Sequence, residues 1–230
     1  MEALDTDIFL TLNSWHGAIG DPFFLLYSGR WVWIPMYAAM LYCLFRDFRW
    51  SQALIYVLGV AALITAADQM CAHVLRPIFE RPRPSADGSP IAEIVQLVEG
   101  YKAGGFGFPS CHAANTMALA MFFSLVIKRW WLTWFLFLWA IVTCYSRIYL
   151  AAHYPGDLLL GSLIGIVFAW IIYIICQWIA GFIQGHRPLN KEKIAHSRLG
   201  SKTSINFYPS TIIVATGLIT VVFMLVISIN

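Results

Sequence analysis

The chain has 230 residues, of which 60% are hydrophobic and 12% are charged. Charged residues make up about a quarter of a typical soluble domain, so this composition excludes an ordinary soluble protein and indicates one that lies in a membrane. The formal net charge of +3 is too small to indicate a nucleic-acid partner. The five cysteines are scattered and odd in number, which predicts neither a disulfide framework nor a metal site.

The N-terminal residues 4–15 precede the long apolar runs. They carry Leu4, Ile8 and Leu12 at helical spacing, with polar residues between them. This pattern predicts an amphipathic helix that lies on the membrane surface, with a frayed terminus as the alternative. The first residues are acidic and lack the basic start and the cleavage site of a signal peptide, so we expect none there.

Six long apolar runs follow. A membrane-spanning helix needs about 20 mostly apolar residues, and its backbone must satisfy its own hydrogen bonds in lipid. The sequence therefore predicts an all-α, polytopic membrane protein that forms a single domain over residues 1–230. The six predicted transmembrane helices cover residues 31–46, 52–75, 110–127, 131–148, 157–183 and 208–229.

Six spans place alternate loops on opposite sides of the membrane. The N-terminus and the C-terminus then share the first side with residues 76–109 and 147–156. The second side carries residues 46–51, 128–130 and 184–207, and with them nine of the 15 Lys and Arg residues. Because cytoplasmic loops are enriched in Lys and Arg, we predict that the second side is cytoplasmic. The first side is then the periplasmic or extracellular face of the cytoplasmic membrane.

The unusual polar residues all fall on the first side, next to helix ends. They are Arg76, Arg83, Ser110, His112, Arg147, His153 and Asp157. Charge in a bilayer is costly and usually functional. Arginines that come together repel each other unless they hold an anion, and guanidinium groups make bidentate contacts with phosphate. We therefore predict a phosphate site at this surface. Arg81 and Lys102 are instead expected to snorkel or to bind lipid headgroups.

His153 and Asp157 predict nucleophilic chemistry. A neutral imidazole is a nucleophile, and a carboxylate on its other nitrogen fixes the tautomer, although such a pair can also be a purely structural hydrogen bond. A second histidine, His112, can protonate the leaving oxygen. Ser110 is expected to cap the helix that it opens, where its hydroxyl and the backbone N–H groups can also bind an anion.

Histidine and aspartate side chains can also bind a metal ion. A metal site is disfavoured, because nearby arginines oppose a bound cation and the spacing of the candidate ligands fits no metal motif. Asp68 lies inside the second predicted span, about two turns before Arg76. It is expected to pair with an arginine or to line a polar pocket, and to take no part in catalysis.

These residues resemble the motifs of the type 2 phosphatidic acid phosphatase (PAP2) family, which read Lys-x6-Arg-Pro, Pro-Ser-Gly-His and Ser-Arg-x5-His-x3-Asp. The third motif is complete here as Ser146-Arg147, His153 and Asp157. The second reads Pro109-Ser110-Cys111-His112, with Cys111 in place of Gly. The first reads Arg76-x6-Arg83-Pro84, with Arg76 in place of Lys.

The resemblance implies a role for each matching residue. His153 is the expected nucleophile, Asp157 its partner and His112 the general acid. The expected phosphate ligands are Arg76, Arg83, Ser110, Cys111 through its backbone N–H, and Arg147. The resemblance also implies that neither a metal nor an organic cofactor is needed.

The resulting hypothesis is a lipid phosphatase or diphosphatase that works at the outer face of the cytoplasmic membrane through a phosphohistidine. The family and the outward site favour undecaprenyl diphosphate as the substrate, with phosphatidylglycerophosphate and the phosphates of lipid A as alternatives. A non-enzymatic lipid or anion transporter is disfavoured, because its polar groups would lie near the midplane of the spans. Vanadate-dependent halide oxidation shares the site, but proteins with that activity are usually soluble. The oligomeric state is not predicted.

Overall fold

The structure is a computed structural model that describes residues 2–183 and 208–229. In these two ranges the regular structure is helical apart from one bridge between Pro82 and Phe106, as the all-α prediction requires. The α-helices are α1 (Glu2–Asn13), α2 (Gly20–Tyr27), α3 (Ile34–Asp47), α4 (Trp50–Gln69), α5 (Arg76–Phe79), α6 (Cys111–Ile127), α7 (Trp130–Tyr149), α8 (Pro155–Ile183) and α10 (Thr211–Ile229). A 3-10 turn, η1 (Trp31–Trp33), leads into α3, and a π-helical segment, η2 (Met70–Leu75), joins α4 to α5.

Each of the six predicted spans is a helix in the structure. Four helices in the described part of the chain are long and apolar enough to cross a membrane, and these are Trp50–Phe79, α7, α8 and α10. The other two are shorter, since α6 has 17 residues and α3 has 14. The chain is therefore a membrane protein with several transmembrane helices, although length and composition support four spans rather than six.

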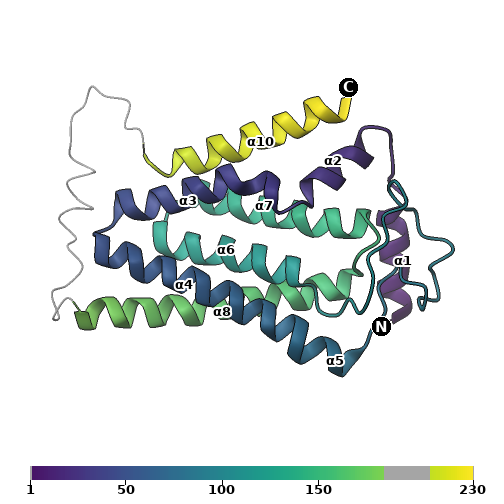
Figure 1. Ribbon diagram of the computed structural model, residues 1–230, viewed down its shortest axis with the longest axis horizontal. Coiled ribbons are helices and arrows are strands. Elements are labelled where there is room, and N and C mark those ends of the chain that lie inside the picture. Colours follow the sequence, from purple (N-terminus) through teal and green to yellow (C-terminus); the bar gives the residue numbers. More distant parts are fainter. Residues whose placement is uncertain (1, 184–207, 230) are drawn as a thin grey trace.

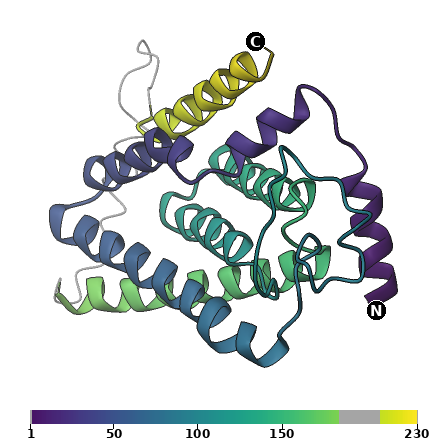
Figure 2. The same ribbon diagram turned by 45° about the vertical axis from the view of Figure 1, so that its right-hand side comes forward.

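The long helices form a bundle along the longest axis of the molecule (Figure 1). α6 and α7 lie at its centre, where α6 packs against α4, α7 and α8 (Figure 2). α10 lies along one edge of the bundle and packs against α2 and α3. α1 crosses one end of the bundle and packs against α7 and α8.

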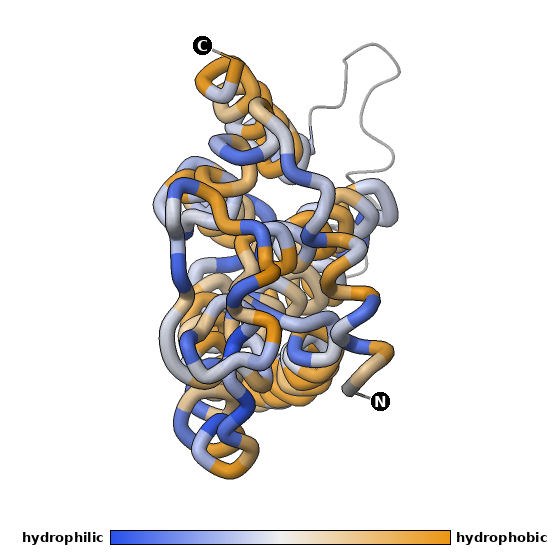
Figure 3. The backbone as a smooth tube through the Cα atoms, turned by 90° about the vertical axis from the view of Figure 1, so that its right-hand side faces the viewer, coloured by the Kyte–Doolittle hydropathy of each residue, from blue (hydrophilic) through white to orange (hydrophobic). Residues whose placement is uncertain are grey.

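The end of the bundle that α1 crosses also carries the segment between α5 and α6 and the turn between α7 and α8 (Figure 1). Figure 3 looks onto this end and shows hydrophilic stretches distributed across it. The α3–α4 and α6–α7 turns lie at the opposite end, so these loops fall at the two ends as the predicted topology requires. Residues 184–207, the third loop of the predicted cytoplasmic side, lie outside the described residues.

Two glycines of α8 allow α6 to approach it closely. A Cβ atom at Gly161 would lie 2.4 Å from the carbonyl oxygen of Ser110, and one at Gly165 would lie 2.1 Å from that of Ala114. These distances are too short for any larger residue, as in other Gly-x-x-x-Gly contacts between membrane helices. The contact places the start of α6 against the start of α8, where Ser110 N donates to the carbonyl of Asp157 at 3.0 Å.

The π-helical segment η2 extends the second predicted span beyond residue 75. Pro77 gives a physical reason for it, because proline has no N–H to donate and its ring clashes with the carbonyl four residues earlier, here that of His73. The widened turn relieves this clash and keeps the helix continuous as far as Phe79. Arg76 is thereby carried on a helix to the end of the bundle that holds the other predicted site residues.

Candidate active site

His153 lies in the turn between α7 and α8 and is almost fully buried, with 1% of its surface exposed. Its Nδ1 is 3.3 Å from Oδ2 of Asp157, and its Nε2 is 3.2 Å from Nη1 of Arg83. A guanidinium can only donate, so Nε2 must be the acceptor and Nδ1 must carry the proton that goes to Asp157. The lone pair of the imidazole is therefore on Nε2, on the side of Arg83.

Asp157 lies in the first turn of α8, and its side chain is fully buried. Oδ2 accepts from the backbone N of Tyr154 at 3.0 Å and from His153. Oδ1 accepts from Nη1 of Arg81 at 2.9 Å. Both oxygens of the carboxylate therefore have donors, and the carboxylate is held in one orientation against the imidazole.

Arg81 links this carboxylate to the N-terminal helix. Its Nη2 lies 2.7 Å from Oδ2 of Asp5 on α1, and its guanidinium carbon lies 3.9 Å from the centre of the Tyr154 ring. Asp5 also accepts from the backbone N of Gly156 at 2.7 Å. The arrangement is a chain of charges, Asp5–Arg81–Asp157, that fastens α1 to the turn carrying His153.

The expectation that Arg81 snorkels or binds a lipid headgroup is therefore wrong, because two carboxylates already hold its guanidinium. Sequence reasoning missed this residue because Asp5 is far away in the chain. The only signal was the acidic N-terminus, which the predicted topology placed on the same side as the arginines. Lys102 pairs with the exposed side chain of Asp87 at 3.0 Å, at the surface of the molecule.

Arg83 and Arg147 approach the same place from different segments. Nη1 of Arg83 donates to the carbonyl of Ala152 at 3.3 Å as well as to His153. Arg147, in the last turn of α7, donates to the hydroxyl of Ser28 and lies 3.5 Å from that of Tyr101. Within the described residues, Nε of both arginines is buried without a hydrogen-bond partner. An anion placed between them would satisfy these donors.

Arg76 reaches the site from the end of the second span. Its Nε and Nη2 both lie 3.4 Å from the carbonyl oxygen of Pro109, just before α6 begins. In the part of the chain that the structure describes, Arg76, Arg83 and Arg147 form no ion pair with a carboxylate. Three cations without acidic partners fit the predicted anion site.

The pKa shifts agree with this clustering. Burial, followed by the charges of Arg76 and Arg147, lowers the pKa of Arg83 to about 10. Burial, followed by the charges of Arg83, Arg147 and Arg76, holds the pKa of His153 well below its usual value. At neutral pH the imidazole is therefore neutral and able to act as a nucleophile, while the guanidinium beside it remains charged.

The second motif opens α6. Ser110 is fully buried and caps this helix, because its Oγ accepts from the backbone N of Ala113 at 3.4 Å. The side chain of Cys111 packs against Ala67, Cys71 and Ala114. Its backbone N–H is the group that we expect to serve the site. Binding of an anion by the backbone N–H groups at the start of this helix stays a prediction.

His112 completes the set. It interacts electrostatically with Arg147, His153, Arg83 and Arg30. The structure thus brings together every residue that the sequence proposed for the site. Arg30, between α2 and η1, is an additional cation that the sequence did not single out.

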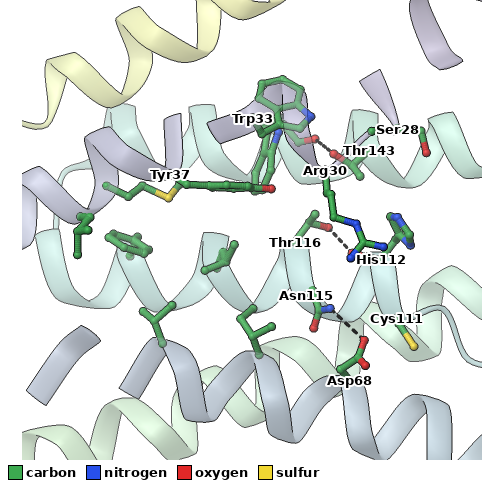
Figure 4. A pocket seen from close by; sticks show the side chains of 18 of the residues that line it. Ser28, Arg30, Trp33, Tyr37, Asp68, Cys111, His112, Asn115, Thr116 and Thr143 are labelled. Atoms are coloured by element: carbon green, nitrogen blue, oxygen red, sulfur yellow. Dashed lines mark hydrogen bonds between the residues drawn. The ribbon is translucent and has the colours of Figure 1, made fainter. Parts of the chain in front are cut away.

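A cavity of about 460 Å³ opens beside His112. It lies between α3, α4, α6 and α7, and its lining includes Arg30, Asp68 and Asn115 (Figure 4). Asp68 pairs with Asn115 across the space between α4 and α6, as the dashed line in Figure 4 shows. Of the two expectations for Asp68, the polar pocket is confirmed and the arginine partner is not.

Comparison with known families supports the same chemistry. The model of the PAP2 superfamily matches residues 53–180, which is more than half of the chain. The chain belongs to the PAP2 superfamily. The matched range contains all three motifs, and the predicted family and the predicted phosphatase class of this PAP2 protein are confirmed.

Curated relatives extend the likeness over most of the chain. This PAP2 protein is 44% identical to the lipid A 4'-phosphatase of Bacteroides thetaiotaomicron over 186 residues, which cover 81% of this chain and 83% of the relative. It is 31% identical to the lipid A 4'-phosphatase of Porphyromonas gingivalis, with 80% of this chain and 79% of that protein covered. The undecaprenyl-diphosphatase of Sulfolobus acidocaldarius is 27% identical, with 72% and 69% covered.

A solved structure shares the fold. The crystal structure of Aquifex aeolicus LpxE superposes on this PAP2 protein with a TM-score of 0.57 and 26% sequence identity. The superposition covers 74% of this chain and 94% of LpxE.

Proposed function

We propose that this protein is a lipid phosphatase that removes a phosphate from a phosphorylated glycolipid of the lipid A type. The observation that supports the chemistry is the geometry of His153. Asp157 holds its Nδ1, and its Nε2 lies 3.2 Å from Nη1 of Arg83, whose buried Nε has no hydrogen-bond partner among the described residues. The support for the substrate class comes from the relatives that are 44% and 31% identical, both of which are named lipid A 4'-phosphatases. These relatives favour the lipid A alternative over undecaprenyl diphosphate.

The first step transfers the phosphoryl group to the protein. Nε2 of His153 forms a bond to phosphorus as the bond from phosphorus to the lipid oxygen breaks. Asp157 stabilises the positive charge that grows on the imidazole. His112 donates a proton to the departing oxygen, so that the lipid leaves as an alcohol.

The second step regenerates the protein. Water attacks the phosphorus of the phosphohistidine, the bond to Nε2 breaks, and inorganic phosphate leaves. The attacking water gives a proton to His112. His112 is the base in this step because it gave up its proton as the acid in the first step. Arg76, Arg83, Arg147, Ser110 and the N–H of Cys111 bind the phosphoryl oxygens in both steps, so that negative charge is compensated as it redistributes.

We further propose that all six apolar helices span the cytoplasmic membrane within one domain over residues 1–230. The site then lies at the periplasmic or extracellular face, where α1 rests on the membrane surface. The sidedness of α1 supports this placement, since Phe9 is buried against the protein while Leu4 and Ile8 are 64% and 42% exposed. The lipid tails would remain among the helices while the phosphate reaches the arginines.

The orientation has a direct test. Cysteine placed at Asp87, in the segment between α5 and α6, should react in intact cells with a thiol reagent that cannot cross the membrane. Cysteine placed at Arg49, between α3 and α4 at the other end of the bundle, should not react. Wild-type protein provides the background labelling of its own five cysteines. The reverse pattern would contradict the proposed topology.

The activity is tested by offering the purified protein four lipids in detergent with a chelator present: lipid A, undecaprenyl diphosphate, phosphatidylglycerophosphate and phosphatidic acid. We expect the fastest phosphate release from lipid A. Orthovanadate, which mimics five-coordinate phosphorus, should inhibit the reaction. The His153→Ala variant should lose activity by about a thousandfold or more, and substrate labelled in its phosphate should label wild-type protein but not this variant.

Three results would contradict the proposal. Activity that survives His153→Ala would exclude the phosphohistidine. Activity that chelation abolishes and added metal restores would favour metal chemistry. Transport of lipid phosphates without phosphate release would favour the transporter alternative.

A further inference from the structure

The cavity beside His112 has a polar end and an apolar end. In Figure 4, Arg30, Asp68 and Asn115 lie near His112, while Tyr37 lies farther from it. The lining also includes apolar residues such as Leu44 and Phe123. Its volume of about 460 Å³ is within the usual range for sites that bind small molecules. A ligand that fills it would therefore place polar atoms next to His112 and apolar atoms deeper in the bundle.

The polar end holds a buried hydrogen-bond acceptor that lacks a donor within the described residues. Nδ2 of Asn115 donates to Oδ1 of Asp68 at 3.3 Å. The amide must be oriented in this way, because a flip would bring its oxygen against the carboxylate. Oδ1 of Asn115 is consequently left buried, with no hydrogen-bond partner among the residues that the structure describes. A buried acceptor without a donor destabilises the protein, and a ligand with an O–H or N–H group would satisfy it.

Asn115 lies about one helical turn from His112, the expected general acid. Asn115 follows His112 by three residues on α6, so the two side chains leave the same face of the helix about 5–6 Å apart. Asp68 faces Asn115 from α4 and forms no ion pair within the described residues. The part of a substrate that meets this pair is the part next to the scissile phosphoester.

We propose that Asp68 and Asn115 form a headgroup subsite that accepts hydrogen bonds from hydroxyl or amide N–H groups next to the scissile phosphoester. The apolar end of the cavity would take an acyl chain of the same molecule. This inference rests on the proposed function, because it places the phosphate at His153. It assigns the two residues a role in specificity and none in the chemical step.

The subsite distinguishes between classes of lipid phosphate. An acylated amino sugar phosphate carries hydroxyl and amide N–H groups close to its phosphoester. Phosphatidic acid and prenyl phosphates carry no such donors there, so their binding leaves Oδ1 of Asn115 without a donor. A site built to hydrogen-bond one substrate rejects an analogue that lacks the donor, because its buried polar groups are left without partners.

The experiment compares two substrates across matched variants. kcat/KM is measured for lipid A and for phosphatidic acid with Asp68→Leu, Asp68→Asn and Asn115→Leu. The control is Gln69→Leu, the same type of change at the adjacent exposed position of α4. We expect Asp68→Leu to lower kcat/KM for lipid A by about ten- to a hundredfold, and Asn115→Leu by about tenfold. Both variants and the control should stay within about twofold of wild type on phosphatidic acid.

Each result has one meaning. Equal losses on both substrates, or no loss on lipid A, would overturn the headgroup subsite while leaving the proposed function intact. Wild-type protein that hydrolyses phosphatidic acid but not lipid A would contradict the proposed substrate class and the subsite with it. If Asp68→Leu fails to fold, Asp68→Asn keeps the size of the side chain and should show the same selective loss to a smaller degree.

Discussion

Arg81 donates a hydrogen bond to Oδ1 of Asp157 at 2.9 Å, on the carboxylate oxygen that His153 does not contact. The same guanidinium pairs with Asp5 at 2.7 Å, so the orientation of Asp157 depends on the first helix of the chain. A carboxylate that must hold an imidazole tautomer works only in a fixed orientation. Arg81 is therefore a positioning residue, although it matches no position in the three motifs.

Replacing Arg81 with Gln should lower kcat by about ten- to a hundredfold, the usual effect of losing a hydrogen bond between charged groups. KM should change much less, because Arg81 does not touch the phosphate. Asp5→Asn should lower kcat by a smaller factor, and Arg81→Lys should recover part of the loss. Steady-state kinetics in detergent provides the measurement, with Lys102→Gln as a control for loss of a surface cation. A change confined to KM would contradict the positioning role.

The close contact between α6 and α8 makes a second prediction. A Cβ atom at Gly161 would lie 2.4 Å from the carbonyl oxygen of Ser110, so Gly161→Ala must push the start of α6 away from Asp157. We expect a loss of stability of about 1–3 kcal/mol, as for other overpacked interfaces, and a fall in kcat as His112 moves away from His153. The apparent Tm and kcat are measured on the same preparation.

Gly181→Ala is the matched control for this change. It lies on the same helix, and an added Cβ would meet nothing within 4 Å. Alanine is also the better helix former, so this variant should keep the wild-type Tm or exceed it slightly. A Gly161→Ala protein as stable and active as Gly181→Ala would show that the two helices can separate without cost.

The active-site motifs could be predicted from the sequence because charged residues next to membrane spans are costly and are therefore usually functional. The apolar runs defined the helix ends, and each of Arg76, His112, Arg147 and His153 lies at one of them. Alternating spans then placed all of them at one end of the bundle, where the structure finds them. Ser110 could be recognised as a helix cap because capping is local and depends on only a few residues.

Features that depend on how distant helices pack could not be predicted in the same way. The pairing of Asp5 with Arg81 exists only because α1 lies across the end of the bundle, and no periodicity encodes that direction. The partner of Asp68 was left open, because pairing with Asn115 depends on the rotation of α4 relative to α6. The second span was predicted to end at residue 75 and in the structure reaches Phe79, because the π-helical turn lets the helix continue past Pro77.

Arg76 replaces the lysine of the family motif, and its contacts indicate how much this matters. Its Nε and Nη2 share a single acceptor, the carbonyl of Pro109, at 3.4 Å each. A lysine would keep the positive charge and lose one weak contact, so Arg76→Lys should stay within about threefold of wild-type kcat/KM. Arg76→Gln removes the charge and should cost about tenfold or more. Equal losses in the two variants would show that the planar guanidinium, and not its charge, is required.

The pH dependence of the reaction should follow His153. Its pKa lies below the usual value because of burial and because of the charges of Arg83, Arg147 and Arg76. Protonation of Nε2 removes the attacking lone pair, so kcat/KM falls as the pH falls through this pKa. A lowered pKa keeps the imidazole neutral in mildly acidic solution, and wild-type activity should persist to a pH well below the ordinary titration of histidine.

Removing a neighbouring positive charge should reverse part of this effect. Arg83→Gln keeps an N–H donor and takes away a cation that opposes the imidazolium, so the pKa of His153 should rise towards its usual value. The acid limb of kcat/KM should then move to higher pH, in addition to any fall in the maximal rate from weaker phosphate binding. Full pH profiles of the two proteins on one substrate measure this, because the titration of the substrate itself is common to both. Lys102→Gln removes a cation of the exposed Lys102–Asp87 pair and should leave the limb in place. An acid limb that is unchanged in Arg83→Gln, or that moves to lower pH, would mean that the charge of Arg83 does not govern the protonation of His153.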